Sequence, residues 1–143
     1  MKIVLDTNCL LQILGSKSRY AFLFDKFLAE EYVLCISNDI LLEYKEILRS
    51  KASHTAADLF MKIIANSKNV VRKDPYFRLG IIQQDNDDNK FTDCAFACNA
   101  DYIVTNDSHF SDAANCEFPK FCTLTIGQFA KMMTVLLFDC LIV

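Results

Sequence analysis

The chain has 143 residues, of which 52% are hydrophobic and 23% are charged, and its net charge is −3. This composition is typical of one globular domain with a substantial core, and it excludes a disordered or collagen-like chain. No run reaches the roughly 18 uninterrupted apolar residues of a membrane helix. Asp6 interrupts the apolar start of the chain, where a signal peptide would have its core. We expect a soluble, cytoplasmic protein without a membrane segment.

The seven cysteines are an odd number, and most lie within apolar runs such as YVLCIS (32–37) and KFCTLT (120–125). A structural zinc site needs about four nitrogen or sulfur ligands at recognisable spacing. The chain has no CxxC pair, and its only histidines are His54 and His109. We therefore expect reduced, buried thiols in a reducing compartment, where cysteine behaves as a small hydrophobic residue.

Short β-branched runs alternate with longer helical patterns, which is typical of a parallel α/β sheet. Strands are predicted at residues 2–6, 32–36, 69–72, 101–107 and 121–125. Helices are predicted at residues 8–14, 18–30, 38–50, 54–66, 88–99 and 126–134. No linker or repeat divides this pattern, so residues 1–134 should form one domain. The apolar tail, residues 135–143, either packs on the core or mediates dimer formation.

Two aspartates follow neighbouring strands of the predicted sheet. Asp6 ends the first strand and Asp107 follows the fourth, so both should lie at the carboxyl edge, where open parallel sheets form their sites. Either aspartate alone could cap a helix, but two adjacent carboxylates repel each other without a cation. Glu43 lies beside the apolar stripe of helix 38–50 and could reach the same edge, although alone it could equally be a solvated flank residue.

The acidic run QDNDDNKFTDCAF (84–96) has the first three ligand positions of a calcium-binding EF-hand loop. Lys90 stands where the loop needs glycine, and Phe96 stands where it needs a bidentate glutamate, so we exclude a calcium loop. Asp85 and Asp87 are predicted to be turn and helix-entry residues that are dispensable for chemistry.

Asp88 and Asp93 differ from those two acids, because the helix that carries them leads directly to the strand before Asp107. Both are candidates for the same site, and the residues alone do not rank one above the other.

At this point the chain resembles the PIN domain family, especially the VapC-like ribonucleases that are the toxins of bacterial toxin–antitoxin systems. The resemblance rests on VLDTN, the glutamate in the helix after the second strand, DDNKFTDCAFACNADYIVTND and the following SHF. It spans residues 1–126 and implies a three-layer α/β/α fold with a central, mostly parallel five-stranded sheet. It places the family's acidic quartet on Asp6, Glu43, Asp88 and Asp107, with Asp93 as a further acid.

The resemblance implies a metal-dependent endoribonuclease that uses one or two Mg²⁺ or Mn²⁺ ions, which prefer carboxylate ligands. Asp6 would be the central ligand, Asp88 or Asp93 and Asp107 would complete the shell, and Glu43 would hold a second ion or orient water. The supporting or substrate-binding positions are Thr7, Asn8, Thr105, Asn106, Arg72 and Lys73. Without the five candidate carboxylates the rest of the chain carries a charge of +2, which is compatible with RNA.

The implied partners are an RNA substrate, an antitoxin that inserts a segment at the acidic groove, and a second copy of the chain in a homodimer. Two other functions are alternatives to a ribonuclease. A haloacid dehalogenase-type phosphatase needs a second acid two residues after its nucleophile, where this chain has Asn8. A non-catalytic PIN-like module would bind RNA or a protein without cleaving it.

Overall fold

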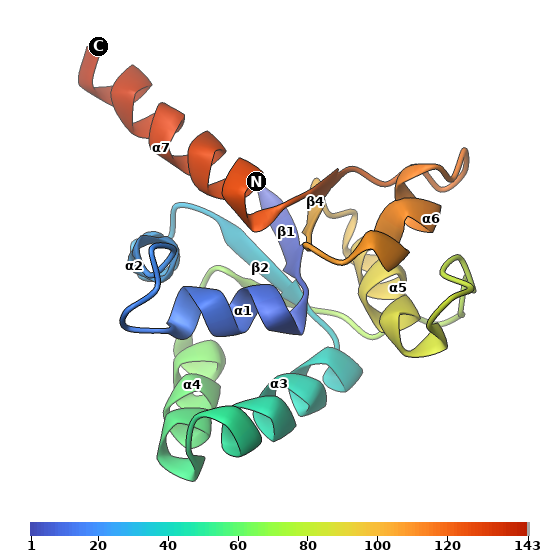
Figure 1. Cartoon of the computed structure of the whole chain (residues 1–143), viewed down its shortest axis with the longest axis horizontal. Helices are drawn as coiled ribbons and strands as arrows, with labels where there is room; N and C mark the ends of the chain where they lie inside the picture. Colours follow the sequence, from blue (N-terminus) through green and yellow to red (C-terminus); the bar gives the residue numbers. More distant parts are fainter. Residues whose placement is uncertain (143) are drawn as a thin grey trace.

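The computed structural model describes the backbone of residues 1–142 and the side chains of residues 1–135. Five strands form one sheet in the order β3-β2-β1-β4-β5 (Figure 1). The strands are β1 (Lys2–Leu5), β2 (Val33–Ile36), β3 (Val70–Arg72), β4 (Tyr102–Val104) and β5 (Thr123–Leu124). Every pairing is parallel, so the predicted five-stranded sheet is confirmed and is parallel throughout.

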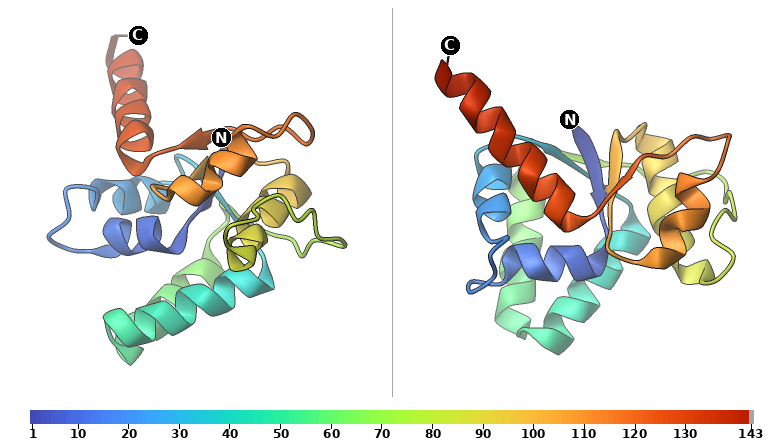
Figure 2. Two further views of the ribbon diagram at one scale, coloured as in Figure 1. Left: turned by 45° about the vertical axis from the view of Figure 1, so that its right-hand side comes forward. Right: turned by 45° about the horizontal axis from the view of Figure 1, so that its top comes forward.

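The helices occupy both sides of this sheet. They are α1 (Thr7–Leu14), α2 (Phe22–Leu28), α3 (Asn38–Lys51), α4 (His54–Asn66), α5 (Asn89–Cys98), α6 (Ser111–Ala114) and α7 (Ile126–Ile142). Two short 3₁₀ turns, η1 (Asn86–Asp88) and η2 (Ser108–Phe110), precede α5 and α6. Helices α1, α2 and α7 lie on one side of β1 and β4, and α5 and α6 lie on the other (Figures 1 and 2).

The central strands are buried on both faces, which explains why they appear in the sequence as continuous apolar runs. Ile3, Val4 and Leu5 of β1 are all buried. Helix α3 begins as predicted at Ser37, whose side chain accepts the backbone N–H of Ile40 at 3.3 Å. These elements bring the carboxyl ends of β1 and β4 together, since Leu5 is paired with Val104.

Several predicted elements are shorter than expected, among them β5, which was expected at 121–125 and spans Thr123–Leu124. The helix expected at 18–30 begins only at Phe22, because the Ser18 hydroxyl accepts the backbone N–H of Tyr20 and favours a turn. The strand expected at 101–107 ends at Val104. Thr105 still donates its N–H to β5, but its hydroxyl accepts the N–H of Asp107, which turns the chain out of the sheet.

The last helix is longer than expected. It was predicted to end at residue 134, but α7 continues to Ile142, because the run TVLLFDCLI has no glycine or proline to interrupt it. The tail defined as residues 135–143 is therefore largely the end of this helix, and it extends away from the sheet and the other helices (Figures 1 and 2). Val143 and the side chains after Val135 lie outside the described residues. Within the described chain, no helix combines the length and apolarity that a membrane crossing requires.

The cysteines largely follow the expectation of reduced thiols. Cys9, Cys35, Cys94 and Cys98 are buried and free. Cys122 is free but exposed, although it lies in an apolar run, because β5 is a two-residue strand at the sheet edge.

Candidate metal centre

Asp6 follows β1 directly at the carboxyl edge of the sheet, and only 7% of its surface is exposed. Its Oδ2 accepts a hydrogen bond from Thr105 Oγ1 at 2.9 Å, and the backbone N–H of Asn8 also donates to its carboxylate. Burial raises the pKa of Asp6, and the negative charges of Asp107 and Glu43 raise it further, while the two hydrogen bonds lower it. Asp6 therefore lies among other acids, and it is held by hydrogen-bond donors from α1 and from the residue that follows β4.

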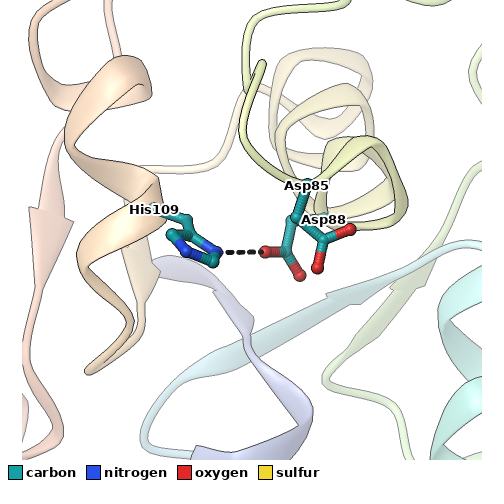
Figure 3. Close-up of side chains that lie close together, drawn as sticks. All are labelled: Asp85, Asp88 and His109. Carbon is teal, nitrogen blue, oxygen red and sulfur yellow. Dashed lines mark ion pairs between the residues drawn. The ribbon is translucent and has the colours of Figure 1, made fainter.

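Asp88 and Asp107 face the same place from the other side of the edge. Asp107 follows β4, and its Oδ1 accepts the backbone N–H of His109 at 2.9 Å. Asp88 Oδ2 lies 3.8 Å from His109 Nδ1 (Figure 3). Both of these atoms are buried and have no hydrogen-bond partner among the described residues. A buried carboxylate oxygen without a donor is costly unless a cation or water compensates it.

The pKa of Asp88 shows that these acids act on one another. Burial raises the pKa of Asp88 to about 6, and the charges of Asp85, Asp107 and Asp6 add to this, while His109 opposes it. Asp88, Asp107 and Asp6 therefore form one electrostatic cluster.

Glu43 approaches this cluster from α3 and has a partner on each oxygen. Its Oε1 accepts a hydrogen bond from Thr7 Oγ1 at 2.7 Å. Its Oε2 is in direct contact with the Nζ of Lys90, which also lies 3.1 Å from Asp87 Oδ1. Burial lowers the pKa of Lys90, but the hydrogen bonds and charges of Glu43 and Asp87 outweigh burial and raise it. The ammonium is therefore a fixed positive charge beside Glu43.

Asp93 lines the same groove as Glu43, but its carboxylate is bound differently from those of Asp6, Asp88 and Asp107. Asp93 Oδ1 accepts the backbone N–H of Leu79 at 3.0 Å, so the carboxylate anchors the segment that precedes η1. Burial raises its pKa, and the opposing effects are this hydrogen bond and the charge of Arg78. The geometry thus brings Asp88, and not Asp93, to Asp6 and Asp107.

The four polar residues that were expected to support the site do not all contact its carboxylates through their side chains. Thr7 and Thr105 hold Glu43 and Asp6 with their hydroxyls, as described above. Asn8 contributes its backbone N–H, while its side chain is exposed. Asn106 Oδ1 accepts the N–H of Ile126 at 3.0 Å, so this side chain fixes the start of α7.

The two basic candidates lie at the end of β3. Arg72 Nε donates to Asn38 Oδ1 at 3.0 Å, and Asn38 is in turn bound by Asp74. Lys73 donates its backbone N–H to Ile36, and its side chain is exposed. Both are therefore placed two strands away from Asp6, in the order β3-β2-β1.

Three residues in the centre were not predicted from the sequence. One oxygen of Asp85 lies within 4.8 Å of ligand atoms of Asp88 and His109 (Figure 3). Asp85 also caps η1 by accepting the N–H of Asp87, which is the turn role that was expected. His109 follows Asp107 by two residues, and Lys90 follows Asp88 by two. Both lie in the stretches that resemble the PIN domain family, which is the signal that could have identified them.

Comparison with models of known protein families identifies the family of this chain. The family model described as PIN domain matches residues 2–109, a span that contains Asp6, Glu43, Asp88 and Asp107. The chain belongs to the PIN domain family. No curated protein sequence matches this PIN domain significantly.

Solved structures share its fold. VapBC2 from Rickettsia felis, in a crystal structure with a DNA fragment from its promoter, is 18% identical, with a TM-score of 0.60 over 87% of this chain and 98% of that one. VapC20 from Mycobacterium tuberculosis, a toxin that cleaves the sarcin–ricin loop, is 17% identical, with a TM-score of 0.56 over 80% and 97%. FitAcB from Neisseria gonorrhoeae is 15% identical, with a TM-score of 0.55 over 87% and 98%. At these identities the likeness shows a common fold.

Proposed function

We propose that this PIN domain is a metal-dependent endoribonuclease with its centre at Asp6, Asp88 and Asp107. The observation that carries the proposal is the buried Asp88 Oδ2, which has no donor among the described residues although it lies in a cluster of like charges. A divalent cation would compensate both the missing partner and the repulsion.

The donor set fits Mg²⁺ or Mn²⁺. All three side chains offer carboxylate oxygens, the ligands that these hard cations prefer, and Thr105 and the Asn8 N–H fix the orientation of Asp6. When bound, such an ion supplies the positive charge that activates water and offsets the charge on the phosphodiester. Cleavage would then be a direct attack by water.

The other residues of the chain would position the reactants. Thr7 turns Glu43 toward the centre by donating to its Oε1, so that Glu43 is placed to orient a water molecule. Asp107 holds the backbone of His109 and thereby the start of η2. Arg72 and Lys73 remain candidates for contacts with more distant phosphates of the RNA.

We further propose that the protein is the toxin of a type II toxin–antitoxin pair and acts in the cytoplasm. This is supported by membership of the PIN domain family and by the shared fold with VapC20, a toxin that cleaves RNA in the sarcin–ricin loop. An antitoxin protein would be its partner, and the projecting α7 is the element that we propose for contact with a second copy of the chain.

Cleavage of labelled RNA tests the activity. The wild type should cleave RNA in Mg²⁺ or Mn²⁺, and both EDTA and the substitution Asp6→Asn should abolish cleavage. Cleavage that survives both treatments would reject the metal-dependent mechanism. RNA binding without cleavage in either metal would instead favour the non-catalytic module.

A further inference from the structure

Lys90 is a lysine whose ammonium contacts Glu43, the acid that approaches the proposed centre from α3. It belongs to the first turn of α5, two residues after Asp88, and only 16% of its side chain is exposed. Its ammonium contacts Glu43 Oε2 and lies 3.1 Å from Asp87 Oδ1. It lines a groove of about 540 Å³ together with Glu43, Asp93 and Arg78, and the groove adjoins the centre through Glu43. The side chain is thus held at the wall of a groove that reaches one of the acids of the site.

The two ends of the acidic cluster differ in whether their carboxylate oxygens have hydrogen-bond partners. At the Asp88 end, Oδ2 is buried and has no partner among the described residues. At the Glu43 end, Thr7 donates to one oxygen and Lys90 to the other, so both carboxylate oxygens are satisfied. Glu43 therefore already has a cationic partner in direct contact, whereas Asp88 Oδ2 has only His109 Nδ1 at 3.8 Å, beyond hydrogen-bond distance.

We propose that the Lys90 ammonium takes the place beside Glu43 that a second divalent ion would take, so that the centre binds one ion and Lys90 contacts the scissile phosphate. This inference rests on the nuclease function proposed above. An ammonium has three N–H donors, and Glu43 and Asp87 use two of them. The third donor is free for a phosphate oxygen, and it would stabilise the negative charge that develops there during cleavage.

The ion pair of Lys90 opposes a second ion beside Glu43. Asp6, Glu43, Asp88 and Asp107 carry four negative charges when ionised, and Lys90 offsets one of them. One divalent ion offsets two more, which leaves one negative charge on these four acids. A second ion at Glu43 would have to displace a largely buried ammonium from its ion pair, and separating such a pair is costly.

Counting bound Mn²⁺ tests the inference without reference to RNA cleavage. The full chain is titrated with Mn²⁺, and free ion is measured by electron paramagnetic resonance. Wild type should bind one ion at the centre, and so should Lys90→Arg, which keeps the charge. Lys90→Met keeps the length of the side chain but removes the charge, so it should bind two ions. Lys62→Met, on the exposed face of α4, is the matched control and should bind one.

The outcomes separate the two proposals. Two tightly bound ions in the wild type, or one ion in Lys90→Met, would overturn the role of Lys90 and leave the proposed centre standing. No bound ion in the wild type would overturn both. Thermal unfolding of each variant shows whether it is folded, and a variant that loses only stability would identify Lys90 as a structural tether.

Cleavage kinetics supply a second readout. At a Mn²⁺ concentration that fills one site, Lys90→Met should lose about 10²-fold in kcat, as for other lost transition-state donors, with a smaller change in KM. Raising the Mn²⁺ concentration should restore part of this loss as the place beside Glu43 fills. A loss that does not depend on Mn²⁺ concentration would contradict the proposal.

Discussion

Asp88 Oδ2 and His109 Nδ1 lie 3.8 Å apart, and within the described part of the chain neither atom has a hydrogen-bond partner. Asp107 fixes His109 in this place by accepting its backbone N–H. The fold therefore holds the two ends of this contact by backbone geometry and leaves a carboxylate oxygen available to a cation.

The first prediction concerns stability and pH. Burial raises the pKa of Asp88 in the folded protein to about 6, above the ordinary aspartate value of 3.8. The folded state therefore binds more protons than the unfolded state between these values, so the contribution of Asp88 is fully present below about pH 4 and is lost as pH rises through about 6. This effect amounts to at most about 3 kcal/mol.

The measurement is urea unfolding in EDTA from pH 4 to pH 7. Asp6 and Asp93 also have raised pKa values, so the comparison of wild type with Asp88→Asn isolates the contribution of Asp88. Asp88→Asn should be the more stable of the two at pH 7, and the difference should shrink toward pH 4. A difference that does not vary with pH would contradict the raised pKa.

The second prediction concerns Asp93 of α5, whose carboxylate holds the segment before η1 through the backbone N–H of Leu79. Asp93→Ala should lower the free energy of unfolding by about 1–3 kcal/mol, because it leaves the N–H of Leu79 without its acceptor. Asp93→Asn keeps an acceptor oxygen and should cost less. Both variants should bind Mn²⁺ as the wild type does when measured by calorimetry. Loss of Mn²⁺ binding at unchanged stability would show that Asp93 is a ligand after all.

The third prediction concerns Thr105, whose hydroxyl positions two acids. It donates to Asp6 Oδ2 at 2.9 Å and accepts the N–H of Asp107 at 3.0 Å. Thr105→Val removes both bonds at nearly constant volume and should weaken Mn²⁺ binding by about 10- to 100-fold, as for other residues that orient metal ligands. Thr105→Ser keeps the hydroxyl and serves as the control. Equal affinities of the two variants in calorimetry would exclude this role.

The sequence predicts the sheet and two of its acids well, for a simple reason. The strands are buried on both faces, so they stand out as apolar runs, and Asp6 and Asp107 are placed by the strands that they follow. The serine cap and the boundaries of α3 and α4 follow in the same way from local patterns. Such features depend on residues that are close together in the sequence, so they can be predicted without knowing the tertiary contacts.

The choice between Asp88 and Asp93 depends on contacts between distant segments. Five residues correspond to about 140° around a helix, so the two side chains cannot face the same way. Which of them faces Asp6 is decided by the segment at Leu79, whose N–H binds Asp93, and by the turn η1 before Asp88. The contact of Lys90 with Glu43 joins α5 to α3 across 47 positions, and no local pattern indicates it.

The role of Asn106 also depends on contacts between distant segments, so the sequence did not predict it. It follows β4 next to Asp107 and was expected to support the site, but its side chain accepts the N–H of Ile126 and so fixes α7. The packing of β5 and α7 against the end of β4 decides this, and that packing is formed by residues about 20 positions further along the chain.

Cleavage of labelled RNA in Mn²⁺ by Asp88→Asn, beside Asp93→Asn and wild type, tests the central claim most directly. Asp88→Asn should lose cleavage, because the centre loses the oxygen that has no donor among the described residues. Asp93→Asn should retain most of the activity, because its acceptor for Leu79 remains. Full activity in a folded Asp88→Asn, or its loss only in Asp93→Asn, would contradict the proposed centre.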